Sequence, residues 1–142
     1  MVKKYLITAI VFLGIGLALG VFFREITKYF EYDLINNHTS LSAMHVHALV
    51  LGFIFSLVMM MLVKVFCIEQ SKIERVAYIA YVIGLSIALI MMLIRGILQV
   101  VDVDFMAKID SALAGIAGLG HILLGLSLVL YAIYLFKGIK EQ

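Results

Sequence analysis

The chain has 142 residues, of which 65% are hydrophobic and 14% are charged, with a formal net charge of +2 and a single cysteine. Soluble domains are about 45–50% apolar and about 25% charged. This composition, with a mean hydropathy of +1.16, excludes a soluble globular domain, a disulfide scaffold, a disordered chain and a nucleic-acid-binding protein. It predicts a single all-α integral membrane domain over residues 1–142.

Four apolar stretches are long enough to cross a bilayer, which takes about 20 helical residues. In chain order they cover residues 5–23, 41–66, 76–101 and 111–136. Backbone groups in lipid must satisfy their own hydrogen bonds, so each stretch is predicted to be a helix. Short connections favour an up-down-up-down four-helix bundle. Gly16 and Gly20 form a GxxxG pair, which favours close packing of the first helix.

Lysine and arginine predict the orientation of the bundle. Four of these residues fall on one side of the four-span arrangement: Arg24, Lys28, Arg95 and Lys108. Seven fall on the other side: Lys3, Lys4, Lys64, Lys72, Arg75, Lys137 and Lys140. We therefore expect both termini in the cytoplasm and a multi-pass protein in the bacterial cytoplasmic membrane.

Ionisable side chains inside a membrane span are expensive and point to function. The second predicted span contains His45 and His47, the fourth contains His121, and Arg95 lies near the outer boundary of the third. No Asp or Glu falls inside the four predicted spans, which argues against a proton-coupled transporter. With a rise of about 1.5 Å per residue, His47 and Arg95 lie about 9 Å and His121 about 15 Å below the outer ends of their helices.

His45 and His47 are about 200° apart around a helix, so they suit two sites on opposite faces rather than one chelate. His121 shares its face with Gly118 and Gly125. Such a face leaves room for a porphyrin ring, although small residues also mark helix–helix interfaces in membranes.

Arg95 could bind a haem propionate, because a guanidinium matches a carboxylate with two parallel hydrogen bonds. Pairing with Asp102 or Asp104 is the alternative role for this side chain. His38 is expected in the outer loop as a surface residue.

The stretch SAMHVHALVLGFIFSLVMM resembles the helix of haem–copper oxidase catalytic subunits that carries an HxH pair. Its HxHxxxxGF pattern, with AGIAGLGHILLGLSLVLY, is also similar to a group of small, uncharacterised bacterial four-span membrane proteins. The resemblance implies that His45 ligates a high-spin haem and His47 a low-spin haem. The chain lacks a further histidine cluster for copper, so the resemblance implies haem binding without oxygen reduction.

These observations together predict a membrane protein that binds haem b, with His47 and His121 as axial ligands and His45 facing a second site. The expected role is electron transfer or redox and gas sensing, in contact with lipid and with quinone or a redox protein as partner, in a chain that could form homo-oligomers. One alternative is a site for copper or another transition metal built from Met44, His45 and His47. Another is a non-catalytic helical membrane subunit. An enzyme has the least support, because no nucleophile–base set appears.

Overall fold

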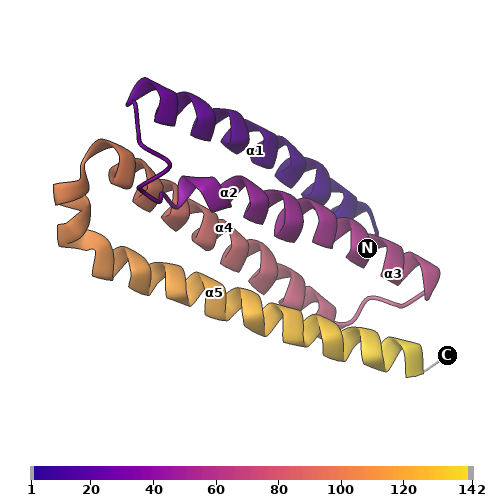
Figure 1. Cartoon of the computed structure of the whole chain (residues 1–142). Coiled ribbons are helices and arrows are strands. Elements are labelled where there is room, and N and C mark those ends of the chain that lie inside the picture. Colours follow the sequence, from indigo (N-terminus) through magenta and orange to yellow (C-terminus); the bar gives the residue numbers. More distant parts are fainter. Residues whose placement is uncertain (1, 141–142) are drawn as a thin grey trace.

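A computed structural model describes residues 2–140 as a set of long helices, with no strand among them (Figure 1). The helices are α1 (Val2–Tyr29), α2 (Leu41–His47), the π-helical segment η1 (Ala48–Ile54), α3 (Phe55–Val65), α4 (Lys72–Val101) and α5 (Val103–Lys140). Four helices are long and apolar enough to cross a membrane: Val2–Tyr29, Leu41–Val65, Lys72–Val101 and Asp104–Lys140. The all-α four-span prediction is thereby confirmed.

Both described chain ends lie at the same end of the bundle, which we call the terminal end (Figure 1). The connection between α3 and α4 lies there too, whereas the connection between α1 and α2 lies at the far end. Most helices run further than the apolar stretches, with α1 continuing from residue 23 to Tyr29. Hydropathy predicts only the part of a helix that is apolar enough to lie in lipid. The helix itself continues through the polar residues beyond, because its backbone hydrogen bonds do not depend on hydropathy.

The most extensive helix packing joins α4 to α5, and α1 packs along α2, η1 and α3. Glycines allow the closest approaches. A Cβ atom added to Gly84 would lie 2.8 Å from the backbone nitrogen of Leu124, and one added to Gly120 would lie 3.1 Å from that of Ala88. In α1, Gly16 accommodates the Leu49 side chain, which agrees with the close packing that the GxxxG pair predicts.

The second span changes from α-helix to π-helix directly after His47, over Ala48–Ile54. Tyr81 of α4 donates a hydrogen bond to the Leu51 carbonyl and lies 3.2 Å from that of Gly52. Since this hydroxyl proton is already used, Ser56 donates to the Tyr81 oxygen at 3.1 Å. The buried Tyr81 side chain therefore ties α4 to backbone carbonyl groups of the π-helical segment.

The connection at the far end is fixed onto α4 just before the second span begins. Thr39 donates its hydroxyl to the Gly96 carbonyl at 3.0 Å, and the Ser40 N–H donates to the Gln99 side chain at 2.7 Å. Leu41 lies directly over Gly96, where a Cβ would come within 2.7 Å of the Leu41 backbone nitrogen. These contacts set the start of α2 and hence the height of its two histidines.

Candidate functional site

The imidazoles of His47 and His121 are held in the same way on different helices. In each ring Nδ1 lies 2.8 Å from the carbonyl oxygen four residues earlier, Ala43 for His47 and Ala117 for His121. A carbonyl oxygen can only accept a hydrogen bond, so Nδ1 must carry the proton in both rings. In a neutral imidazole this leaves Nε2 with its lone pair directed away from the helix backbone. Both side chains thus present the nitrogen that would ligate a metal.

His45 has different surroundings from His47. Its ring stacks on Phe23 of α1, with ring centroids 6.3 Å apart and an interplanar angle of 16°. Gly20 lies under the same ring, where an added Cβ would be 3.9 Å from the His45 side chain. The Nδ1 atom of His45 is buried and has no hydrogen-bond partner. His45 therefore faces α1 and keeps an unpaired ring nitrogen.

Met44 is fully buried and lines an apolar cavity of about 390 Å³ between α1 and α4. Successive α-helical residues point about 100° apart, so Met44, His45 and His47 diverge around α2. Met44, His45 and His47 therefore do not share one face of α2. Within residues 2–140, no group of three or more His, Cys, Asp or Glu residues is placed to hold a metal ion.

His121 is exposed on α5, and its face carries open glycines. Nothing lies within 4 Å of a Cβ added to Gly118 or Gly125. Over most of its length α5 packs on α4 rather than on α2 or η1. The structure therefore does not bring His121 into direct helix packing with His47, and the two glycine positions beside His121 are open.

Arg95 forms an ion pair across the α4–α5 interface, with its Nη2 atom 2.7 Å from the Asp110 carboxylate. The partner is Asp110 rather than Asp102 or Asp104, the two acids that the sequence suggested as the alternative. Asp102 instead caps the start of α5, accepting from the Phe105 N–H at 2.9 Å. The Nε atom of Arg95 is buried without a hydrogen-bond partner, so the guanidinium keeps one donor for another acceptor.

His38 lies in the connection between α1 and α2, where its carbonyl accepts a hydrogen bond from the Tyr32 hydroxyl at 3.0 Å.

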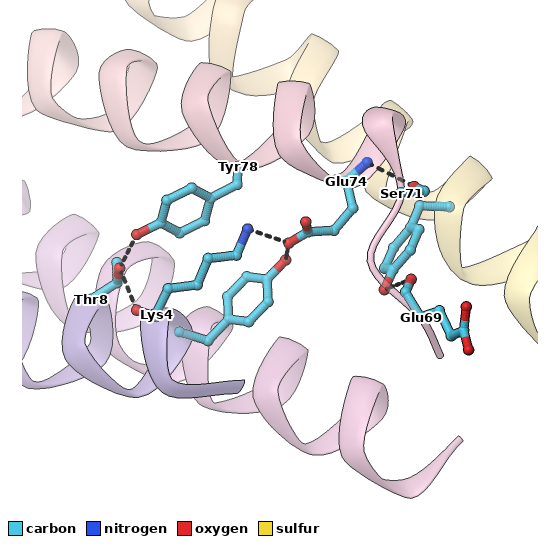
Figure 2. Close-up of polar contacts among 8 residues, drawn as sticks. Lys4, Thr8, Glu69, Ser71, Glu74 and Tyr78 are labelled. Carbon is cyan, nitrogen blue, oxygen red and sulfur yellow. Dashed lines mark hydrogen bonds and ion pairs between the residues drawn. The ribbon is translucent and has the colours of Figure 1, made fainter. Parts of the chain in front are cut away.

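A buried carboxylate at the terminal end is absent from the sequence interpretation. Glu74, in the first turn of α4, is fully buried. Its Oε1 atom lies 2.6 Å from the Lys4 ammonium and accepts a hydrogen bond from the Tyr5 hydroxyl at 2.5 Å (Figure 2). Glu74 lies two residues before the predicted third span, 76–101, in the part of α4 that extends beyond it.

The same cluster contains a second pair of hydroxyls, from Thr8 and Tyr78. Thr8 donates to the Lys4 carbonyl at 2.9 Å, and the Tyr78 oxygen lies 2.7 Å from the Thr8 hydroxyl (Figure 2). Because the Thr8 proton is used, Tyr78 is the donor in this contact. The Lys4 ammonium also lies 4.3 Å from the centre of the Tyr78 ring, a cation–π contact.

The local sequence explains why Glu74 is not predicted to be a functional residue. Ser71 caps α4 by accepting a hydrogen bond from the Glu74 N–H at 3.1 Å. A Ser-x-x-Glu pattern is typical of a capping box, in which the glutamate side chain turns back to the capping residue. Here the carboxylate turns toward α1 instead. The pattern that indicates this cluster is the Lys4–Tyr5 pair at the terminal end of the first span. Both side chains can bind a carboxylate from another helix at that end of the bundle.

A family model described as a protein of unknown function (DUF2871) matches residues 2–138, and the chain belongs to this family. No curated protein and no solved structure matches the chain.

Proposed function

We propose that this DUF2871 member is a haem b-binding protein of the bacterial cytoplasmic membrane, with His47 and His121 as axial ligands. The observation that carries the proposal is the shared tautomer of these two side chains. A ligating histidine usually donates its other ring N–H to a carbonyl or carboxylate, which orients the ring and raises its basicity. His47 and His121 both make this bond, and both leave Nε2 available.

The space around the two residues supports the proposal. Directly packed helices lie about 8–10 Å apart, too close for a porphyrin and two imidazoles between them. The second span packs mainly on α1 and also on α4, and α5 packs on α4, so the second span and α5 are not closely packed on one another. The open positions at Gly118 and Gly125 leave a flat face beside His121. A haem held by two imidazoles would supply one-electron chemistry, which suits electron transfer or redox sensing.

Two further residues fit the same cofactor. Arg95 has an unpaired Nε–H besides its ion pair with Asp110, so it could bind a propionate without losing that partner. His45 points to α1 with an unpaired nitrogen and serves a second site in this proposal, as the resemblance of the HxH segment to haem–copper oxidase helices implies. Quinone or a redox protein is the proposed partner of the electron transfer.

Absorption spectroscopy of the protein purified from haem-supplemented cells tests the proposal. We expect a Soret band with split visible bands on reduction, and a pyridine haemochrome spectrum of haem b. His47→Ala and His121→Ala should each abolish or shift these bands. His38→Ala is the matched control, because His38 lies in the connection between α1 and α2 and should leave the spectrum unchanged.

A protein that folds and takes up no porphyrin under these conditions contradicts the proposal. Metal analysis of the same sample distinguishes the copper alternative, since copper without porphyrin would favour a site at Met44, His45 and His47.

A further inference from the structure

Two buried polar atoms at the terminal end lack a full set of hydrogen-bond partners: Oε2 of Glu74 has none, and the hydroxyl of Tyr131 has none other than Tyr5. Their residues are 0% and 2% exposed. They belong to one cluster, because Tyr5 donates to Glu74 and the Tyr5 ring centroid lies 6.3 Å from that of Tyr131. Buried polar atoms are almost always paired with protein groups or ordered water. The cluster is therefore incomplete as a set of protein side chains.

Both atoms are chemically complementary to water. The hydrogen bond from Tyr5 and the ion pair with Lys4 both end on Oε1 of Glu74, so the lone pairs of Oε2 are left as acceptors. The Tyr131 hydroxyl can donate and accept. A water molecule needs two or more polar partners to be held inside a protein, and these two atoms would supply them.

A polar pocket lies next to this cluster and opens at the terminal end. Its volume is about 460 Å³, and its lining includes Glu69, Ser71, Tyr134 and Lys137. Ser71 lines this pocket, and its hydroxyl accepts a hydrogen bond from the backbone N–H of Glu74. The pocket therefore borders the turn of α4 that carries Glu74.

We propose that Glu74 and Tyr131 bind a water molecule from this pocket, and that Glu74 is a proton-exchange site at the terminal end of the bundle. In the exchange, an O–H bond forms at Oε2 of Glu74 as one breaks on the bound water, which regains a proton from the hydrated pocket. No electron is transferred. The Lys4–Glu74 pair then changes from zero net charge to +1, while Lys4 keeps its ammonium proton.

Among the groups that surround Glu74, Lys4 carries the charge that influences proton exchange at the carboxylate. From α1, Lys4 and Tyr5 contact the carboxylate. Tyr78 of α4 lies beneath the Lys4 ammonium, and Tyr131 and Tyr134 approach from α5. The tyrosines are neutral at physiological pH. Lys4 is 25% exposed, so its long side chain can move toward water when Glu74 becomes neutral.

Infrared difference spectroscopy of the full chain in bilayers, recorded between neutral and acidic pH without added haem, tests this site. We expect the high-frequency carbonyl stretch of a buried protonated carboxylic acid, distinct from the lower-frequency band of the exposed carboxyl groups, to appear on acidification and to be missing in Glu74→Gln. Tyr131→Phe should shift that band and remove an O–H stretch of weakly bonded internal water. Glu69→Gln is the matched control, because Glu69 is an exposed carboxylate of the same pocket and should change neither signal.

The proposal is overturned if the acid band persists in Glu74→Gln, if no such band appears across the pH range, or if Tyr131→Phe leaves the water signal intact. If Glu74→Gln fails to fold, Tyr131→Phe still tests the proposal, because it retains the Glu74 carboxyl group and should shift the acid band and remove the water signal. Because the measurement uses haem-free protein, its outcome is independent of the haem proposal.

Discussion

Gly84 of α4 and Gly120 of α5 face each other so closely that each occupies the space where the other would carry a side chain. A Cβ on Gly84 would lie 3.0 Å from the Gly120 carbonyl oxygen, and a Cβ on Gly120 would lie 3.2 Å from that of Gly84. The obstructing atoms are backbone, which cannot rotate away. The α4–α5 interface, the most extensive in the structure, therefore depends on these two positions.

Gly84→Ala should destabilise the protein by about 1–3 kcal/mol, the usual cost of overpacking, measured by unfolding in detergent micelles. Gly14→Ala is the matched control, because Gly14 is also within a helix and nothing lies within 4 Å of an added Cβ. It should keep or slightly raise stability through the helix propensity of alanine. Equal effects at the two positions would contradict the close approach of α4 and α5.

Lys4→Met should destabilise the protein more than Glu74→Gln does. Removing Lys4 leaves an uncompensated buried carboxylate, which typically costs about 3–5 kcal/mol. Removing the Glu74 charge leaves a lysine that is already 25% exposed and can reach water.

Denaturant unfolding of both single variants and of the double variant measures the coupling of Lys4 and Glu74. The double variant should be more stable than Lys4→Met, because no buried charge remains in it. Lys3→Met serves as control, since Lys3 is exposed and its loss should change stability by less than about 0.5 kcal/mol. A coupling energy near zero would show that the ion pair does not form.

Tyr81→Phe should loosen the π-helical segment. The substitution keeps the ring but leaves the carbonyls of Leu51 and Gly52 without their donor from α4. A buried polar group left unpaired costs about 1–3 kcal/mol. Faster amide hydrogen exchange within Ala48–Ile54, together with lower thermal stability, is the expected result. Tyr29→Phe, at a side chain that is 81% exposed, should have neither effect.

Asp33 titrates below the ordinary range in the connection between α1 and α2. Its carboxylate accepts a hydrogen bond from the Asn36 side chain and from the backbone N–H groups of Ile35 and Asn36, which lower its pKa below 3.8. A lowered pKa in the folded state means that these bonds stabilise the loop above about pH 3.8 and are lost as the pH falls through the folded-state pKa.

Asn36→Ala should therefore raise the pKa of Asp33 toward its ordinary value, as measured by the pH titration of its carboxyl signal in NMR. The backbone donors remain, so the rise should be partial. An unchanged titration would show that the Asn36 amide does not bind the carboxylate in solution.

The sequence predicts the number and order of the spans well, because bilayer thickness alone dictates the length of an apolar helix. It predicts their ends poorly, since α1 continues through Arg24 and Lys28 as a regular helix. Nothing in the local sequence distinguishes a charged residue that ends a helix from one that extends it into the aqueous phase.

The polar sites show the same limit. The sequence indicates His45, His47 and His121 as candidate site residues, because few ionisable side chains fall inside its apolar spans. The tautomers of these histidines cannot be predicted from the sequence, because they depend on the side-chain rotamers and on contacts with backbone carbonyls one helical turn away. Glu74 was overlooked because the hydroxyl that binds it belongs to Tyr5, 69 residues earlier in the chain, while the adjacent Ser71 already offered a sufficient local explanation.

The π-helical segment η1 forms a wide turn that accommodates an extra residue within the second span. Each residue of a π-helix contributes less rotation than a residue of an α-helix, so the seven residues of Ala48–Ile54 turn through about the same angle as six α-helical residues. Deleting one residue from this segment would therefore restore the i to i+4 pattern and leave His45 and His47 in nearly the same directions relative to α3. A deletion from the regular helix of α3 would instead turn the two imidazoles by about 100° relative to the residues that follow it. The second span thus tolerates a change of length at η1 that would misalign both histidines elsewhere.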